Sequence, residues 1–247
     1  MTKPVHIVVI ARGVMLELLR RKDLAVLLIF AAVYLAFVAA ARFVGLENPA
    51  TGTFLMNLSL SLITVLAHLV TLTTAARQLP DEMDKGTIYP LLARPVSRFE
   101  ILLGKWAACV VAGLLLFGVM ISCALLLVPK LEPYEAATLI QLLLLQVPAI
   151  ALTAAIGIMC SLLLPRLPGL LAAVALVFGS GFASRFAGRL VVPYLLPDPW
   201  RLNLVLRYTD GIAPLSLNDF ILLFIYGLLW LTILLVFSGA LFQRRRL

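Results

Sequence analysis

The chain has 247 residues, of which 63% are hydrophobic and only 13% are charged. Soluble domains average about 45–50% apolar and about 25% charged residues, so this composition excludes a soluble domain and predicts an integral membrane protein. The net charge of +8 does not indicate nucleic-acid binding, because the basic residues flank apolar runs and do not gather on one polar domain.

The first part of the chain predicts a helix on the membrane surface followed by two spans. Residues 4–22 combine an apolar stripe at helical spacing with a basic end, which is typical of an amphipathic interfacial helix. Residues 24–41 carry no charge and are about long enough to cross a hydrocarbon core of about 30 Å. A short turn leads to the second predicted span, 54–76, in which His68 is the one ionisable residue.

Four further apolar runs follow and complete a predicted bundle of six spans. They lie at 106–128, 136–164, 169–190 and 220–242. Between the last two, residues 191–218 contain several prolines and charges and are expected to form an outer loop. We therefore predict an all-α membrane protein with a single transmembrane permease domain over residues 1–247 and both termini in the cytoplasm.

The basic residues predict this orientation. With both termini inside, 14 of the 20 Lys and Arg residues fall on the inner side and six on the outer side, as the positive-inside rule requires. The three cysteines, Cys109, Cys123 and Cys160, lie within apolar runs and are interpreted as small packed hydrophobes, with no disulfide or metal site. We expect no catalytic, cofactor-binding or metal-binding residues in this chain.

The stretch from residue 77 to 105, which we call the charged segment, holds nine of the 32 Lys, Arg, Asp and Glu residues. The second span is expected to end near Arg77, and Pro80 is expected to start a new short helix, because a proline in a first turn lacks only an unpaired N–H. Ser97 is a suitable N-cap for the helix that continues into the third span. The charge count places this segment in the cytoplasm.

Several elements stand in a fixed order within the charged segment. They are Glu82-x-x-x-Gly86-Thr87, Leu91-Leu92, Pro95-Val96-Ser97-Arg98 and Gly104-Lys105. This order, between the second and third spans, resembles the signature in the first cytoplasmic loop of ABC transporter permeases of the type 2, exporter class. The interfacial helix, the six spans and the basic C-terminal end agree with that resemblance more coarsely.

The resemblance implies a half-transporter that pairs with a second copy in a bacterial inner membrane and is driven by a separate cytoplasmic ABC ATPase. ATP and Mg would bind to that partner, because Gly104-Lys105-Trp106 lacks the first glycine and the hydroxyl of a phosphate-binding loop. We predict that the charged segment forms the ATPase-coupling contact. The residues predicted for it are Asp81, Glu82, Asp84, Gly86, Thr87, Arg94, Pro95, Ser97, Arg98, Gly104 and Lys105.

A second group of residues predicts a substrate path or an outer gate. His68 lies within a span, where ionisable residues are functional candidates, although packing or an interhelical hydrogen bond also explains it. Arg185 and Arg189 are four residues apart and would share a helix face. Lipid headgroups, an anionic substrate or the outer acids Asp198 or Asp210 would neutralise their charges. Trp200 and Arg201 belong to an outer segment that forms an outer gate, a short helix dipping into the membrane interface with Trp200 as an anchor, or a surface loop.

Two alternatives from other classes remain at this point. A membrane-embedded enzyme of lipid metabolism would need converging catalytic groups, and the acids of this chain show no such spacing. An ATP-independent membrane scaffold or assembly factor is the other. The small residues Ala149, Thr153 and Gly157, spaced by four, permit close helix packing either within the chain or with a second copy.

Overall fold

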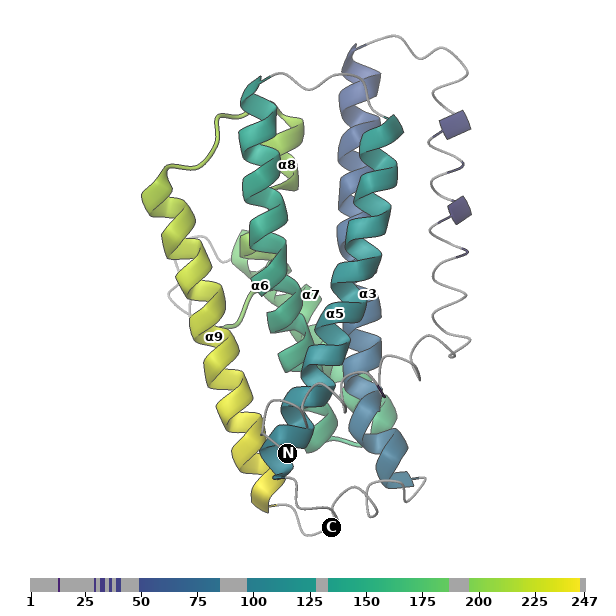
Figure 1. Cartoon of the computed structure of the whole chain (residues 1–247), viewed down its shortest axis with the longest axis vertical. Helices are drawn as coiled ribbons and strands as arrows, with labels where there is room; N and C mark the ends of the chain where they lie inside the picture. The colour runs from purple at the N-terminus through teal and green to yellow at the C-terminus, as the bar shows by residue number, and fades with distance from the viewer. Residues whose placement is uncertain are drawn as a thin grey trace.

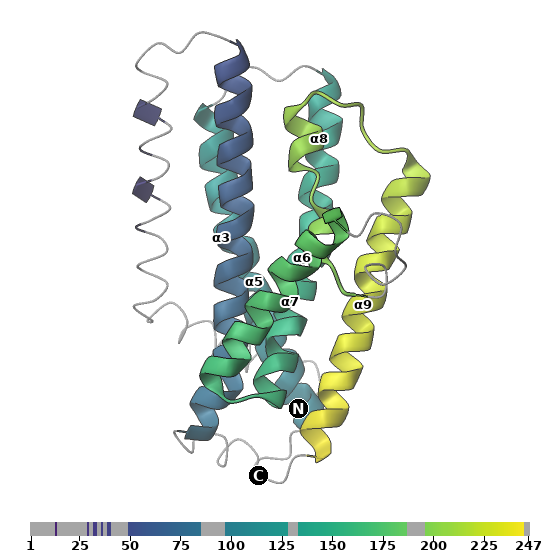
Figure 2. The ribbon, with the colours of Figure 1, turned by 180° about the vertical axis from the view of Figure 1, so that it is seen from behind.

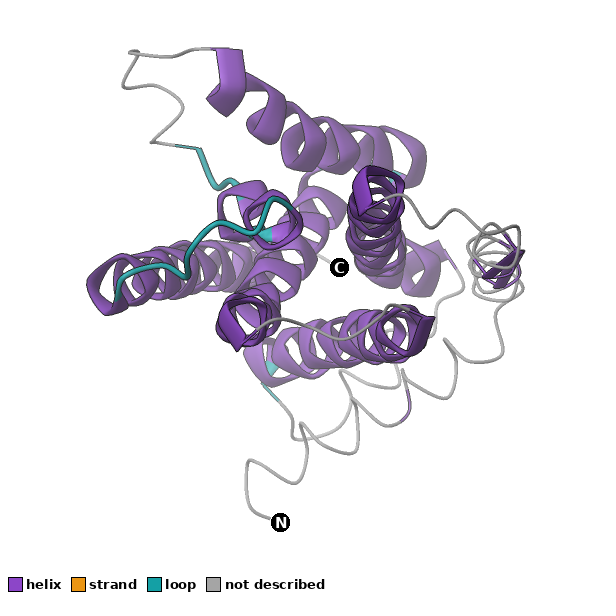
Figure 3. Ribbon diagram, turned by 90° about the horizontal axis from the view of Figure 1, so that it is seen from above, coloured by secondary structure: helices purple, strands orange, loops and turns teal. Residues whose placement is uncertain are grey.

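The computed structural model describes residues 49–84, 97–127, 133–186 and 196–244, together with a few isolated positions before residue 41. Within these ranges the chain is helical and contains no strand (Figure 3). The predicted interfacial helix at 4–22, the first span at 24–41 and residues 85–96 of the charged segment lie outside the described residues. Both the span count of six and the cytoplasmic position of the termini therefore stay predictions.

Seven helical elements make up the described part of the chain. They are α3 (Pro49–Asp84), α5 (Arg98–Leu127), α6 (Pro133–Leu163), α7 (Arg166–Phe186), the 3₁₀ helix η2 (Pro199–Leu202), α8 (Val205–Thr209) and α9 (Leu217–Arg244). Five of them, α3, α5, α6, α7 and α9, are long and apolar enough to cross a membrane. They coincide with the second to sixth predicted spans, so the prediction of a multi-pass all-α protein is confirmed in this coarser form.

The helices α3, α5, α6 and α9 lie side by side along the bundle, and successive long helices run in opposite directions (Figures 1 and 2). One end of the bundle therefore holds the last residues of α3, α6 and α9 and the first residues of α5 and α7. We call it the basic end. The arginines and lysine of the described ranges near it are Arg77, Arg98, Lys105, Arg166 and Arg244.

The helix that enters the charged segment is longer than predicted, whereas the helix that leaves it begins where the predicted cap at Ser97 places it. α3 does not end near Arg77 but continues through Pro80 to Asp84, so the prediction of a new helix at Pro80 is wrong. Leu79 is buried in the bundle, and this apolar packing opposes the loss of the backbone hydrogen bond that a proline removes. At the other side of the segment, α5 begins at Arg98, eight residues before the predicted span.

Packing differs strongly between helices. In the most apolar part of α6, 78% of the residues are buried, against 17% in α9. α6 is thus the central helix, and α9 lies at the outside with apolar side chains such as Leu222, Val236 and Phe237 exposed. Exposed apolar side chains of this kind suit a helix that faces lipid.

Glycines allow the central helices to approach closely. A Cβ on Gly157 of α6 would lie 2.7 Å from Cβ of Ala75 on α3, and a Cβ on Gly113 of α5 would overlap the side chain of Thr71. The predicted stripe of Ala149, Thr153 and Gly157 is therefore used within the chain, against α3. Van der Waals packing of this kind is a main source of helix association in membranes.

The predicted outer loop is only in part a surface loop. α7 stops near the middle of the bundle, where η2 lies, and α8 lies toward the end opposite the basic end (Figure 2). Leu202, Val205 and Tyr208 of this stretch are buried. The segment does contain a short helix, as one of the predicted alternatives had it, but this helix packs against the other helices with Pro199 and Leu202 buried.

Candidate functional site

The first candidate region lies at the start of α5. Ser97 and Glu100 form a reciprocal capping box, in which the backbone N–H of Glu100 donates to Oγ of Ser97 at 3.2 Å. The N–H of Ser97 in turn donates to Oε2 of Glu100 at 3.0 Å. This arrangement satisfies two donors that the helix itself leaves unpaired. The predicted cap at Ser97 is confirmed, so α5 has a defined starting point at the end of the charged segment.

Removing the cap gives a direct test of this starting point. We expect Ser97→Ala to lower the free energy of unfolding by about 1 kcal/mol, because an N–H near the start of α5 loses its acceptor. The matched control is Ser122→Ala on the same helix, whose hydroxyl donates only to the carbonyl of Gly118 in the preceding turn. Thermal unfolding of the purified variants compares the two, and equal midpoints would contradict the cap.

Arg98 contacts another helix of the chain. Its Nη1 donates to the carbonyl of Phe242 at 3.0 Å and lies 3.4 Å from that of Gln243, both in the last turn of α9. The guanidinium also lies 5.9 Å from the ring centroid of Phe242. A cation at a helix C-terminus is favourable, and here it satisfies carbonyls that the helix leaves unpaired. Arg98 therefore joins the start of α5 to the end of α9.

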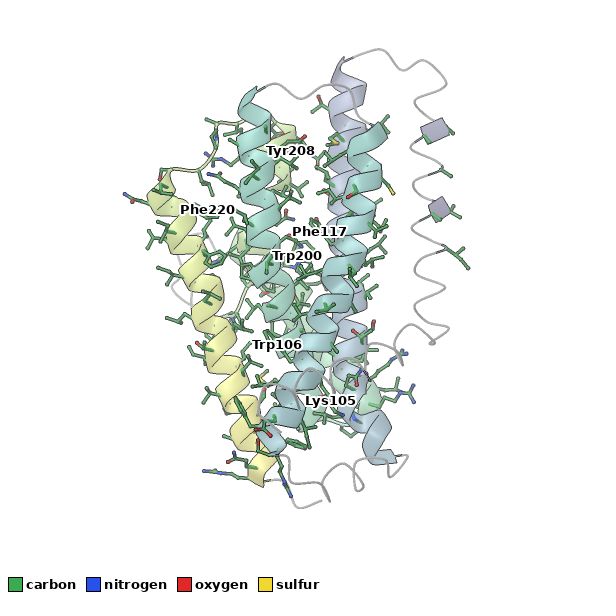
Figure 4. The ribbon with its side chains drawn as sticks, viewed as in Figure 1. Lys105, Trp106, Phe117, Trp200, Tyr208 and Phe220 are labelled. Atoms are coloured by element: carbon green, nitrogen blue, oxygen red, sulfur yellow. The ribbon has the colours of Figure 1, made fainter. Side chains whose placement is uncertain are left out.

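Lys105 lies differently from its prediction as a contact on the surface. It is buried in the bundle, with 1% of its surface exposed, near the basic end (Figure 4). A side chain in this position is not accessible to another protein, so Lys105 is removed from the predicted contact. The sequence around Lys105 does not show whether its side chain is buried or on the surface, because α5 is apolar on all sides beyond this residue.

The second candidate region is a polar cluster in the interior, around His68 on α3. Nδ1 of His68 lies 2.7 Å from Oγ1 of Thr153 on α6, and Nε2 of Gln146 lies 3.2 Å from its Nε2. Thr153 donates its hydroxyl to the carbonyl of Ala149. Nδ1 must then donate to Thr153, and Nε2 accepts from Gln146, so the contacts fit a neutral imidazole. The structure thus shows His68 forming interhelical hydrogen bonds between α3 and α6.

Trp200 of η2 covers this histidine. The two ring centroids are 5.1 Å apart, and the ring of Phe178 on α7 lies 5.3 Å from that of Trp200. The indole Nε1 donates to the carbonyl of Val177 at 2.9 Å. Gly181 provides the space for the ring, since a Cβ there would lie 2.5 Å from Cδ1 of Trp200. Trp200 is therefore a half-buried residue near the middle of the bundle (Figure 4).

Asp198 holds the start of η2 inside the bundle. It is fully buried, and its Oδ1 accepts from the N–H of Trp200 at 3.0 Å and lies 3.3 Å from Oγ of Ser180. Its Oδ2 lies 3.8 Å from Nε of Arg201. Among the described residues Oδ2 accepts no hydrogen bond, so the carboxylate is held by the contacts of Oδ1 and by the nearby charge of Arg201.

Tyr226 of α9 binds the same segment from the other side. Its hydroxyl accepts from the N–H of Asp198 at 3.0 Å and donates to the carbonyl of Leu196, also at 3.0 Å. The guanidinium of Arg201 lies 5.7 Å from the centroid of the tyrosine ring. We call the residues from 196 to 204 the buried segment, after its four buried residues Asp198, Pro199, Leu202 and Leu204; Leu196 at its start is exposed. It is held by α7 through Ser180 and by α9 through Tyr226.

The structure brings together only part of the predicted gate. His68, Trp200 and Arg201 converge on the buried segment, whereas Arg189 and the side chain of Arg185 lie outside the described residues. Sequence reasoning missed the roles of Gln146, Ser180 and Tyr226. The Asp198-Pro199 pair, an N-cap followed by proline, was a usable signal for η2. No comparable signal marks Tyr226 within its apolar run.

The contacts in these two regions hold helices together. Within the described ranges, no three His, Cys, Asp or Glu side chains come together as metal ligands, and the three cysteines are free. Cys109 and Cys160 are buried, as predicted for packed hydrophobes. The two regions can transmit or resist movement between helices, because each consists of hydrogen bonds that cross from one helix to another.

Comparison with known proteins identifies the family. A family model described as ABC-2 family transporter protein matches residues 17–183, which is more than half of the chain and includes α3, α5, α6 and most of α7. The match also includes the whole charged segment. A search of curated proteins found no match.

Proposed function

The chain belongs to the ABC-2 family of transporter proteins, and on that basis we propose that it is the membrane-spanning permease subunit of an ATP-driven exporter. In this proposal, a separate cytoplasmic ABC ATPase binds ATP and Mg and hydrolyses the nucleotide. The permease itself catalyses no reaction and converts the movement of that ATPase into movement of its own helices. The working unit is a homodimer in a bacterial inner membrane.

One observation supports the coupling role above the others. The charged segment joins two helices that are both well anchored at the basic end, since α3 continues buried through Leu79 and α5 starts at the Ser97–Glu100 cap. A force applied to the segment would reach both helices within one turn. A segment that was loosely joined to its helices would dissipate such a force.

The described contacts narrow the predicted ATPase contact. Lys105 is buried, and Arg98 is engaged with α9, so neither is proposed as a primary contact. The residues that stay in the proposal share the stretch between the two anchors and its immediate flanks. They are Asp81, Glu82, Asp84, Gly86, Thr87, Arg94, Pro95 and Ser97. Gly104 lies inside α5 and is buried like Lys105, so it is not proposed as a primary contact either.

The buried segment suits the proposed gate. It occupies the interior of the bundle beyond the end of α7, with Trp200 over His68 and Asp198 beneath Tyr226. Substrate passing through this half of the bundle would have to displace it. Arg185 and Arg189 stay predicted members of the substrate path, and membrane lipids stay the predicted surroundings of the exposed apolar faces.

Charge reversal in the charged segment tests the coupling proposal. The full-length permease carrying Glu82→Lys and Arg94→Glu is co-expressed with an ABC ATPase that co-purifies with the wild-type permease, and the complex is purified through a tag on the permease. We expect recovery of the ATPase to fall at least tenfold, because like charges across an interface oppose association. Arg98 is left unchanged in this variant because its replacement would also disturb α9.

The matched control is Glu135→Lys, the same reversal at the opposite end of the bundle, in the first turn of α6. It should retain normal recovery of the ATPase and normal ATP hydrolysis in lipid. If the double variant binds its ATPase as well as Glu135→Lys does, the charged segment is not the coupling contact.

A further inference from the structure

α9 is attached at two distant points, one at the basic end and one at the buried segment. At the basic end, Arg98 donates to the carbonyls of its last turn. Near its middle, Tyr226 binds both the N–H of Asp198 and the carbonyl of Leu196. Tyr226 and Phe242 are separated by 16 residues, or about 24 Å along a helix at 1.5 Å per residue.

Close packing supports both attachments. A Cβ on Gly239 would lie 2.6 Å from the ring of Phe99, so the first turn of α5 rests directly on α9. Gly227, next to Tyr226, faces Pro148 of α6 and Leu202 of η2, to which an added Cβ would come within 3.0 and 3.1 Å. Each end of this stretch is therefore in contact with backbone as well as with side chains.

Between these points α9 is suited to move as one piece. No proline interrupts residues 217–244, and the helix is the least buried of the five long helices. A continuous helix resists bending over about four turns. Between the two attachments one face of α9 is buried against the bundle at Leu231, Leu234 and Leu235, and its other face is exposed. A displacement of the start of α5 would therefore reach the residues around Tyr226.

We propose that α9, fastened by Arg98 at one point and by Tyr226 at the other, transmits movement between the charged segment and the buried segment. Arg98 is a positioning residue in this scheme, since it fastens α9 to the helix that follows the charged segment. Tyr226 passes the movement to the backbone at Leu196 and Asp198. The connection through α9 is present in the permease without any ATPase. Only the statement that movement starts at the charged segment rests on the proposed function.

Hydrogen–deuterium exchange on the full-length permease in nanodiscs, without any ATPase, tests the link. The N–H groups of Asp198, Trp200 and Asn203 donate to Tyr226, Asp198 and Trp200 respectively, so their exchange reports opening of the buried segment. We expect Arg98→Ala to speed exchange at least threefold in peptides covering 196–204, as well as in the last turn of α9. Arg98→Lys, which keeps a charged donor, should restore most of the protection.

A double-mutant cycle separates transmission through α9 from general loosening. Tyr226→Phe alone should speed exchange in 196–204, because the hydroxyl that holds the segment is lost. In that background, Arg98→Ala should add nothing further in 196–204 while still affecting the last turn of α9. Sites more than about 10 Å apart normally act independently, so this non-additivity would be specific evidence for a link.

Arg244→Ala is the matched control, since Arg244 is an exposed arginine in the same last turn. It should leave exchange in 196–204 unchanged. The proposal is overturned if Arg98→Ala affects only the end of α9, or if its effect on 196–204 is undiminished by Tyr226→Phe. Should Arg98→Ala give little folded protein, Arg98→Gln, which keeps a donor without the charge, replaces it in the same cycle. Loss of ATPase binding in the charge-reversal experiment would leave this result intact.

Discussion

Replacing Asp198 by alanine is expected to lower the free energy of unfolding by about 2–4 kcal/mol, the range for removing one partner of a buried, hydrogen-bonded charge. The carboxylate caps η2 through the N–H of Trp200 and pairs with Arg201. Without it, the N–H of Trp200 loses its acceptor and the guanidinium of Arg201 loses its nearby carboxylate. The unfolding midpoint of the purified permease in detergent measures the loss.

Two further variants separate the parts of this effect. Asp198→Asn keeps an oxygen that can accept from Trp200 but loses the charge, so it should lie between the alanine variant and the wild type. Asp210→Ala removes an exposed acid of the same connection and should change stability by less than about 0.5 kcal/mol. If Asp198→Ala is as stable as Asp210→Ala, the buried segment is not held by its carboxylate.

The second large effect is expected from Gly113→Leu on α5. A Cβ at this position already overlaps the side chain of Thr71 on α3 and lies 3.0 Å from Cγ2 of Ile150 on α6. A leucine there must push the three helices apart. Overpacking a dense core costs about 1–3 kcal/mol and more where the neighbours are rigid helices, so we expect at least about 3 kcal/mol and poor recovery of monodisperse protein.

Gly118→Leu on the same helix is its control. No atom lies within 4 Å of a Cβ at Gly118, and leucine favours helix formation over glycine by close to 1 kcal/mol. This variant should therefore be neutral or slightly stabilising. Gel-filtration profiles after graded heating compare the two leucine variants, and similar losses in both would show that the close approach at Gly113 is not required.

The predicted spans agree with the described helices because the membrane imposes a local requirement. A run of about 20 apolar residues is needed to cross the hydrocarbon, and such a run can be read without knowing its neighbours. The ends of the helices were harder to predict. The sequence predicts a helix start at Pro80. In the structure α3 continues through Pro80, and the preceding residues Gln78 and Leu79 are buried.

The candidate sites show the same division. Ser97 and Glu100 are three residues apart, so their capping box could be predicted from local spacing. The acceptors of Arg98 within the chain lie 144 and 145 residues away on α9, so no local spacing could predict them. Asp198 had been noted as an outer acid, and nothing in its neighbourhood showed that it would be fully buried.

The sequence by itself therefore determined the class of the protein, the positions of five described spans and the family signature in the charged segment. Each of these depends on residues that are close together in the chain. Only the tertiary structure decided that His68 bonds to Thr153, that Lys105 is buried and that α9 holds both Arg98 and the buried segment. A polar side chain in a membrane interior takes whichever partner the packing of distant helices provides, and that choice is absent from any local pattern.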